Sequence, residues 1–432
     1  MQYYSTNRIS AMASFKDASI KGQAPDKGLY FPETIPQVDK DLISNIDELS
    51  NDEIAFRVIK PYVGSDIAEA KLFDIVKETI NFPIPLVAVN EDIYSLELFH
   101  GNTLAFKDIG ARFMSRCLGY FVKGDARKVT VLVATSGDTG GAVADGFYGI
   151  DGVEVVILYP AGKVSLVQEK QLTTAGENIH AIEVNGTFDD CQKMVKQAFA
   201  DAVLNEKLFL TSANSINVAR WLPQQFFYFF AYKQWLERAQ PPVISVPSGN
   251  LGNICAGLLA KKSGLPIEHF IAACNANDVV PKFMDTAIYK SQASVTTISN
   301  AMDVGDPSNF IRILELFNHE FAGLKNVLSS VSISDEETKN TIQKVFKEYN
   351  YLLDPHGAVA FTALQDHLKH HPNEKGIFME TAHPVKFYDV VEPLLQIVID
   401  LPASVKQIID KPKNAKQMEV DHAALKSFLL QL

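Results

Sequence analysis

Short runs of apolar residues alternate with longer amphipathic segments in the middle of the chain. The runs over 127–134 (RKVTVLVA), 153–160 (VEVVILYP) and 178–184 (NIHAIEV) are rich in β-branched residues and predict buried strands. Each run is followed by a turn and a helical pattern, and Thr187 with Asp190 is a start signal for the helix after the third run. Strands that alternate with helices predict a parallel sheet covered on both faces, and therefore an α/β fold.

The alternation resumes after an aromatic segment. The pattern predicts a single helix over 219–236 (ARWLPQQFFYFFAYKQWL), which leaves little polar surface. We interpret it as part of the core, with a subunit interface as the alternative. A strand, a glycine loop and a helix are then expected within 241–264, and further strands over 269–276 and 376–381.

The composition excludes some functions. The net charge of −11 argues against a general electrostatic surface for nucleic acid or for an anionic membrane. No run reaches the roughly 18 apolar residues of a membrane span, and the start of the chain lacks the basic and apolar regions of a signal peptide. We therefore expect a cytoplasmic protein. The four cysteines form no C-x-x-C pair, so neither zinc nor a redox couple is indicated.

Three loops follow predicted strands and therefore lie where parallel sheets bind ligands. They are 135–141 (TSGDTGG), 247–253 (PSGNLGN) and 380–384 (ETAHP). The second can form a nest of backbone N–H groups for a phosphate, although a plain glycine turn is the alternative. The first can hold a carboxylate through its hydroxyls, or again be only a turn. Neither loop matches a P-loop or a dinucleotide fingerprint.

Lys107 lies in HGNTLAFKD (100–108), beside three apolar residues. Such a lysine can simply pack its stem and keep its ammonium in water. A lysine held in an apolar pocket, however, has a lowered pKa and becomes a nucleophile suited to a covalent bond with an aldehyde. The residues alone leave both interpretations open.

Six ordered motifs resemble those of the threonine synthase family, pyridoxal-phosphate enzymes of the tryptophan-synthase β fold type, fold type II. The motifs are AFKD, ATSGDTGGA, NSINVAR, PSGNLGN, DPHGAVA and TAHPVKF, and the likeness runs from residue 28 to about 390. The resemblance implies two doubly wound parallel-sheet domains plus an N-terminal segment. We expect the N-terminal domain over 1–95, a smaller α/β domain over 96–220 and a larger one over 221–432, with strands able to cross between them.

The resemblance also implies roles for single residues. Lys107 would carry the cofactor, pyridoxal 5'-phosphate, and then serve as the acid and base, while Thr381 would face the pyridine nitrogen. The cofactor's phosphate would bind Gly249, Asn250, Leu251, Gly252 and Asn253. The substrate's carboxylate would bind Thr135, Ser136, Asp138 and Thr139, although many relatives of the wider fold type have asparagine in place of Asp138. The substrate's own phosphate would bind Asn214, Ser215 and Arg220.

Four further polar residues near these motifs have other expected roles. We interpret His356 and His383 as histidines that cap or hydrogen-bond loops. Asp108 is expected in a structural hydrogen bond or a helix start, and Arg112 is a second candidate for phosphate contact.

The implied reaction converts O-phospho-L-homoserine and water into L-threonine and phosphate, by a monomer or homodimer. One alternative is a serine/threonine dehydratase of the same fold, whose substrate carries no phosphate, so Arg220 and Asn214 discriminate between the two. The other is a threonine-synthase-like protein that only binds phosphorylated ligands, against which Lys107 argues. A nicotinamide oxidoreductase would need the missing dinucleotide fingerprint.

Overall fold

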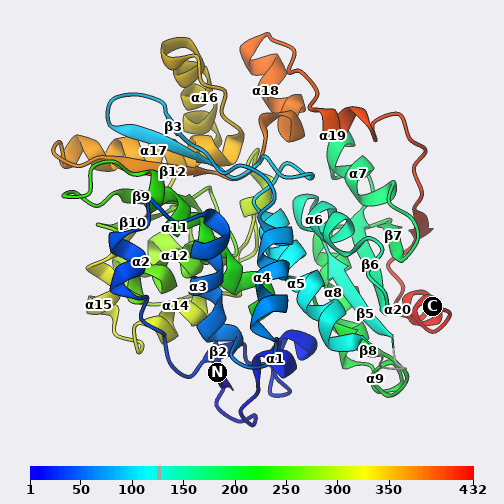
Figure 1. Ribbon diagram of the computed structural model, residues 1–432. Helices are drawn as coiled ribbons and strands as arrows, with labels where there is room; N and C mark the ends of the chain where they lie inside the picture. Colours follow the sequence, from blue (N-terminus) through cyan, green and yellow to red (C-terminus); the bar gives the residue numbers. More distant parts are fainter. Residues whose placement is uncertain (124–127) are drawn as a thin grey trace.

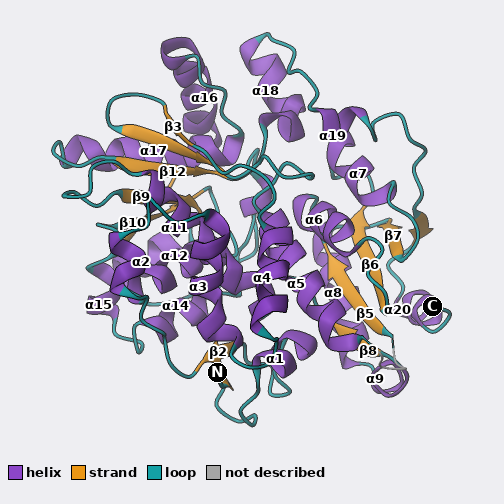
Figure 2. Cartoon of the chain, viewed as in Figure 1, coloured by secondary structure: helices purple, strands orange, loops and turns teal. Residues whose placement is uncertain are grey.

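The computed structural model describes residues 1–123 and 128–432 (Figure 1). It contains two large β-sheets with helices around both, as Figure 2 shows. The predicted α/β class is confirmed. The first residue of the strand predicted over 127–134, residue 127, lies outside the described residues.

The smaller of the two sheets has five parallel strands in the order β13-β7-β6-β5-β8. Three of its strands are those predicted from the apolar runs, and β13 comes from near the end of the chain. The strands are β5 (Val129–Ala134), β6 (Val153–Pro160), β7 (Ile179–Val184), β8 (Phe209–Thr211) and β13 (Lys416–Met418).

The larger sheet has six strands in the order β11-β10-β9-β12-β4-β3, parallel except for β3. Its first two strands in the chain precede the smaller sheet in sequence, so the chain passes between the two halves. The strands are β3 (Leu86–Ala88), β4 (Ile93–Glu97), β9 (Val243–Pro247), β10 (Phe270–Cys274), β11 (Leu328–Ser332) and β12 (Gly376–Glu380).

Helices follow most strands, as the alternating pattern predicts. The N-terminal segment adds a two-stranded sheet of β1 (Tyr3–Ser5) and β2 (Tyr30–Pro32), with α1 (Phe15–Lys21), α2 (Lys40–Ser44), α3 (Asn51–Val63) and α4 (Glu69–Thr79). Around the smaller sheet are α5 (Lys107–Val122), α6 (Asp138–Phe147), α7 (Leu166–Thr173), α8 (Phe188–Ala200), α9 (Ala202–Lys207) and α20 (His422–Leu429). The larger sheet carries α12 (Gly252–Lys262), α13 (Val279–Thr286), α14 (Phe310–Leu316), α15 (Phe321–Lys325), α16 (Asp335–Tyr349) and α17 (Pro355–His370), and η3 (Pro384–Phe387), α18 (Tyr388–Leu395) and α19 (Ala403–Lys406) follow it.

The aromatic segment is not one helix, which corrects the sequence prediction. It divides into α10 (Val218–Trp221), a 3-10 turn η1 (Leu222–Gln224) and α11 (Gln225–Gln234). Pro223 has no N–H for the helical bond to residue 219, so the chain tightens into a 3-10 turn there. The aromatic side chains of this segment are buried within the chain, which confirms its interpretation as part of the core.

No helix in the described part of the chain is long and apolar enough to span a membrane. All four cysteines are free and buried, as expected of small apolar side chains.

Candidate active site

Lys107 is the first residue of α5, and the residues just before it pair with the chain that leaves β12. The N–H of Phe106 donates to the carbonyl of Thr381 at 3.0 Å, and the N–H of His383 donates to that of Leu104 at 3.0 Å. Leu104 has a φ of 59°, which turns the chain toward this pairing. The segment that carries the lysine therefore lies against the segment that carries Thr381.

Burial shifts the amine of Lys107 toward its neutral form. Burial lowers the pKa of Lys107 to about 8, the Asp138 carboxylate opposes the shift, and the cations Lys386 and Arg220 reinforce it. Within the described residues its Nζ forms no hydrogen bond or ion pair, and the nearest aromatic ring, that of Phe106, is centred 5.7 Å away. A larger share of this amine than of an ordinary lysine is therefore unprotonated near neutral pH, which favours its action as a nucleophile.

The glycine loop after β9 is built to approach an anion closely. A Cβ at Gly249 would lie 2.7 Å from Cα of Met302, so only glycine fits there. Leu251, with a φ of 61°, is the N-cap of α12, and Nδ2 of the buried Asn253 has no hydrogen-bond partner in the described chain. A buried N–H donor without a partner at a helix N-terminus fits the phosphate of the expected cofactor.

The loop after β5 turns sharply into α6. Gly137 has a φ of 136°, and the Thr135 hydroxyl accepts hydrogen bonds from the N–H of Gly137 at 3.0 Å and of Gly140 at 2.9 Å. The hydroxyl of Thr135 thus fixes the loop. Ser136 and Thr139 are only half-buried, which leaves their hydroxyls more accessible to a ligand.

Asp138 forms a buried ion pair with Lys386, which lies in η3 beyond the larger sheet. The Nζ of Lys386 is 2.7 Å from Oδ1 of Asp138 and donates to the carbonyl of Thr103 at 2.8 Å, and Gln168 donates to Asp138 at 2.9 Å. Burial alone would raise the pKa of Asp138, but the ammonium groups of Lys386 and Lys107 outweigh it, and the pKa lies well below its usual range. The carboxylate is thus charged and neutralised by its neighbour.

Lys386 is a site residue that the sequence interpretation missed. It is the lysine of TAHPVKF, so a signal was present in a motif that had been recognised. Its side chain is fully buried, and it joins the loop after β5 to the segment after β12.

Arg220 lies in α10 and is 3% exposed, yet its Nε and Nη1 have no hydrogen-bond partner within the described residues. Burial lowers its pKa to about 10, which the Asp108 carboxylate opposes. A Cβ at Gly110, in the first turn of α5, would lie 2.7 Å from the carbonyl oxygen of Arg220 and 3.1 Å from its Nε. The guanidinium therefore lies against the turn that begins at Lys107, with unused donors that suit an anion.

Ser215 lies against the glycine loop. Its hydroxyl accepts hydrogen bonds from Nδ2 of Asn250 at 2.7 Å and from Nδ2 of Asn309 at 3.0 Å. Asn214 is half-buried, and its carbonyl accepts from the N–H of Asn217 at 3.1 Å. The NSINVAR segment therefore connects the glycine loop at one end with the unpaired arginine at the other.

The two histidines near the site form loop hydrogen bonds, as predicted. His356 is buried, with Nδ1 at 2.5 Å from Asp354 and Nε2 accepting from the N–H of Ala301 at 3.2 Å. Nδ1 of His383 accepts from the N–H of Val385 at 3.1 Å, and burial lowers the pKa of His383 to about 4.

Asp108 and Arg112, the next two charged residues on α5 after Lys107, are also paired. Asp108 accepts the N–H of Thr103 at 3.0 Å, which confirms its structural hydrogen bond, and burial raises its pKa to about 6. Arg112 is committed to Asp145 at 3.3 Å and to Asn81, so it has little left for a phosphate.

The fold and the site define a pyridoxal-phosphate-dependent enzyme: a lysine of lowered pKa lies on a segment paired with the chain after β12, and a glycine loop with an unused donor follows β9, the parallel neighbour of β12. Residues 79–379 match the family model of the pyridoxal-phosphate dependent enzymes, residues 2–80 that of the threonine synthase N terminus, and residues 357–429 that of the threonine synthase C-terminal part. The chain belongs to the threonine synthase family.

Individual relatives agree with this membership over the full length. The chain is 44% identical to the threonine synthase of Haemophilus influenzae over 432 residues, all of both chains. The crystal structure of threonine synthase from Escherichia coli superposes with a TM-score of 0.93 at 42% identity and full coverage of both chains. That of the threonine synthase from Brucella melitensis, described as bound to pyridoxal phosphate, gives 0.93 at 32% identity, over 100% of this chain and 99% of that one.

Proposed function

We propose that this protein converts O-phospho-L-homoserine and water into L-threonine and phosphate. The observation that carries the proposal is Arg220, a buried guanidinium with two unpaired nitrogens next to the first turn of α5. Leaving a buried charge unpaired is costly, so such a group is expected only where a ligand supplies the counter-charge. A planar fork of N–H donors is suited to a phosphate.

Pyridoxal phosphate, when bound, supplies an electron sink for the carbanions that form at Cα and Cβ of the substrate. We propose that Lys107 carries it covalently, that the glycine loop 249–253 holds its phosphate, and that Thr381 faces its ring nitrogen. The lowered pKa of Lys107 and the unused Nδ2 of Asn253 support these roles.

The other residues position the substrate and move its protons. We propose that Ser136 and Thr139, with the first turn of α6, hold the α-carboxylate, in a loop fixed by Thr135. The Nζ of Lys107 takes up the proton from Cα and then one from Cβ, which lets phosphate leave from Cγ; it returns a proton to Cγ and, once the OH of water has added at Cβ, one to Cα, because its pKa of about 8 permits both protonation states near neutral pH.

Asp138 does not repel the substrate's carboxylate, since the Lys386 ammonium neutralises it at 2.7 Å. We propose that this pair takes the place of the asparagine found in many enzymes of the fold type, and holds the carboxylate loop against the segment after β12. The substrate's phosphate would bind Arg220, with Asn214 and Ser215 connecting that site to the cofactor loop.

One assay compares the proposal with its alternatives. Phosphate release from O-phospho-L-homoserine is measured beside keto-acid formation from serine and threonine, with the same preparation. We expect rapid phosphate release and slow keto-acid formation. The reverse order would identify a dehydratase, and neither product would identify a protein that only binds.

A second measurement tests the lysine on its own. The purified protein should be yellow, and Lys107→Ala should lose both covalent attachment of the cofactor and turnover. Borohydride treatment should fix the cofactor at position 107 and nowhere else.

A further inference from the structure

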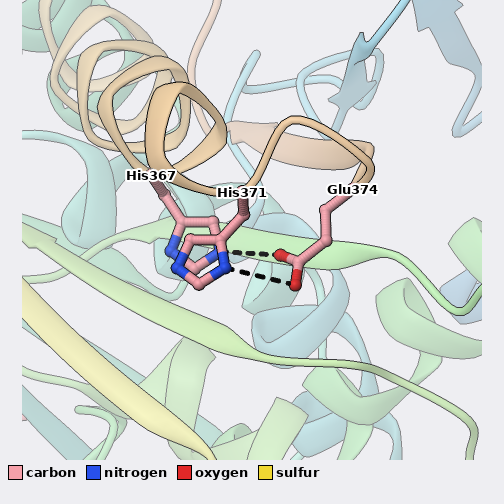
Figure 3. Close-up of side chains that lie close together, drawn as sticks. All are labelled: His367, His371 and Glu374. Carbon is pink, nitrogen blue, oxygen red and sulfur yellow. Dashed lines mark hydrogen bonds and ion pairs between the residues drawn. The ribbon is translucent and has the colours of Figure 1, made fainter.

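Three side chains with metal-binding atoms converge at the end of α17, between the DPHGAVA and TAHPVKF motifs in the sequence. Nε2 of His367 is 2.8 Å from Oε2 of Glu374, and Nδ1 of His371 is 3.5 Å from Oε1 of the same carboxylate. All three ligand atoms lie within 4.8 Å of one another. Figure 3 shows both imidazole rings turned toward the one carboxylate.

The local sequence accounts for this convergence. His367 lies in the last turn of α17 and His371, four residues later, is its C-cap, and their rings stack with centroids 4.2 Å apart and an angle of 9°. The N–H of Glu374 donates to the carbonyl of His371 at 3.0 Å, which folds the carboxylate back toward the helix end. The C-terminus of a helix favours a positive charge at this position.

The neighbouring charged and basic groups are engaged elsewhere. Nδ1 of His370 lies 2.9 Å from the carbonyl of Asp366. The Nζ of Lys375 pairs with Glu237 at 2.6 Å. Glu374 is therefore left to the two histidines, and in the described chain no lysine or arginine forms an ion pair with it.

The two histidines of the cluster differ in exposure, since His367 is largely buried and His371 is open to solvent. The side chain of His367 is 15% exposed, and its ring stacks on that of His269 with centroids 5.5 Å apart. The side chain of His371 is 49% exposed, so an ion from solvent can reach the ligand atoms.

We propose that His367, His371 and Glu374 bind a divalent transition-metal ion of the Zn²⁺ class, including Ni²⁺, Co²⁺ and Cu²⁺. Two imidazole nitrogens and one carboxylate oxygen are a ligand set that such borderline ions prefer, with water in the remaining position. A single carboxylate with two imidazoles is a poor site for Mg²⁺ or Ca²⁺, which need mostly oxygen ligands.

The position in the fold makes this ion structural. Glu374 lies two residues before β12 begins at Gly376, whereas Thr381 follows the carboxyl end of the same strand. A strand of five residues spans roughly 16 Å, which separates the cluster from the active site. The ion would fasten the end of α17 to the turn that leads into β12, and turnover should not depend on it.

Calorimetric titration of the holoenzyme with ZnCl₂ tests the proposal, since His370 provides a matched control one residue away. We expect one saturable site per chain, binding at least about tenfold more weakly in His371→Ala and in Glu374→Gln, and unchanged in His370→Ala. MgCl₂ should give no saturable signal. Equal affinity for the wild type and His371→Ala, or no saturable Zn²⁺ binding at all, would overturn the proposal.

A second readout does not rely on calorimetry. Zn²⁺ at about 100 times the wild-type dissociation constant should raise the thermal midpoint of the wild type and of His370→Ala by a few degrees, and that of His371→Ala by at most about half as much. Phosphate release by His371→Ala should remain at the wild-type rate. A midpoint shift in His371→Ala as large as that of the wild type would place the ion elsewhere and refute the assignment.

Discussion

Of two buried arginines, one lies in the short helix α10 and the other packs against it, and they differ in how their N–H donors are used. Arg312, on α14, is fully buried, and its guanidinium lies 4.4 Å from the ring of Trp221. Its N–H groups donate to four acceptors: the carbonyls of Tyr30, Ser215 and Ile216 and the side chain of Asn309. Arg220, the residue before Trp221, has two nitrogens without a partner in the described chain.

Burial does not distinguish the two residues, and neither does pKa. Burial lowers the pKa of each arginine to about 10. Only the use of their donors separates a structural cation from one that awaits a ligand. The same difference recurs between two lysines: Nζ of Lys386 contacts a carboxylate and a carbonyl, whereas Nζ of Lys107 has no hydrogen-bond or ion-pair partner among the described residues.

Replacing Arg220 should give the largest effect on turnover of the substitutions considered next. We expect Arg220→Met to lower kcat/KM for O-phospho-L-homoserine about 100- to 1,000-fold, because a desolvated charge pair with the substrate is lost. The free energy of unfolding should stay the same or rise, since a buried unpaired charge is removed. Steady-state kinetics and urea unfolding measure the two quantities.

Arg220→Lys is the matched control for the fork of donors. It keeps the positive charge and should lose only about tenfold in kcat/KM, because one ammonium cannot contact a phosphate in the bidentate way. A large fall in the free energy of unfolding with either variant would show that Arg220 is structural, as Arg312 is, and would contradict the difference between the two residues.

Replacing Arg312 should show the opposite behaviour. Arg312→Met leaves four acceptors near α10 without their donor, and we expect a loss of about 3–5 kcal/mol in the free energy of unfolding. Wherever the variant remains folded, its KM should change little, since Arg312 supplies no free donor to a ligand. Denaturant titration beside the kinetics is the measurement, and a destabilisation below about 1 kcal/mol would contradict it.

The Asp138–Lys386 pair gives a smaller effect that a double-mutant cycle can isolate. Asp138→Asn and Lys386→Met should each lower kcat/KM by about 10- to 100-fold, because each leaves a buried charge without its partner. The double variant should recover part of the loss, since no unpaired charge remains. Strictly additive losses would show that the two residues act separately.

The parts of the fold that depend on neighbouring residues were predictable from the sequence. The strands β5, β6 and β7 follow from their apolar runs, and Thr187 with Asp190 forms the capping box expected at the start of α8. The family resemblance implies that Lys107 and Thr381 serve the same cofactor, and the pairing of the segments that carry them is consistent with this.

Contacts between distant residues were not predictable in this way. The pair of Asp138 with Lys386 joins two motifs through side-chain geometry, which no local pattern encodes. The absence of partners at Arg220 depends on everything that packs around it, so a sequence can only suggest an arginine near an anion site. The break of the aromatic segment at Pro223 has a local signal, the proline itself, whereas the apolar pattern alone predicts one continuous helix.

The smallest expected effect is a shift in the pH dependence of cofactor attachment, which depends on both buried lysines, Lys107 and Lys386. In the cofactor-free protein, the rate of covalent attachment of pyridoxal phosphate follows the neutral fraction of Lys107, so it should rise through a pKa of about 8 rather than 10.5. Asp138→Asn removes the carboxylate that opposes the shift and should move the profile to lower pH, whereas Lys386→Met should move it to higher pH.

The folded-state pKa of Lys107 lies below its unfolded value, so the unfolded chain binds more protons between about pH 8 and 10.5. The stability of the cofactor-free wild type relative to Lys107→Met should therefore rise with pH across that window, and a flat difference would show that the amine is solvated like an ordinary surface lysine.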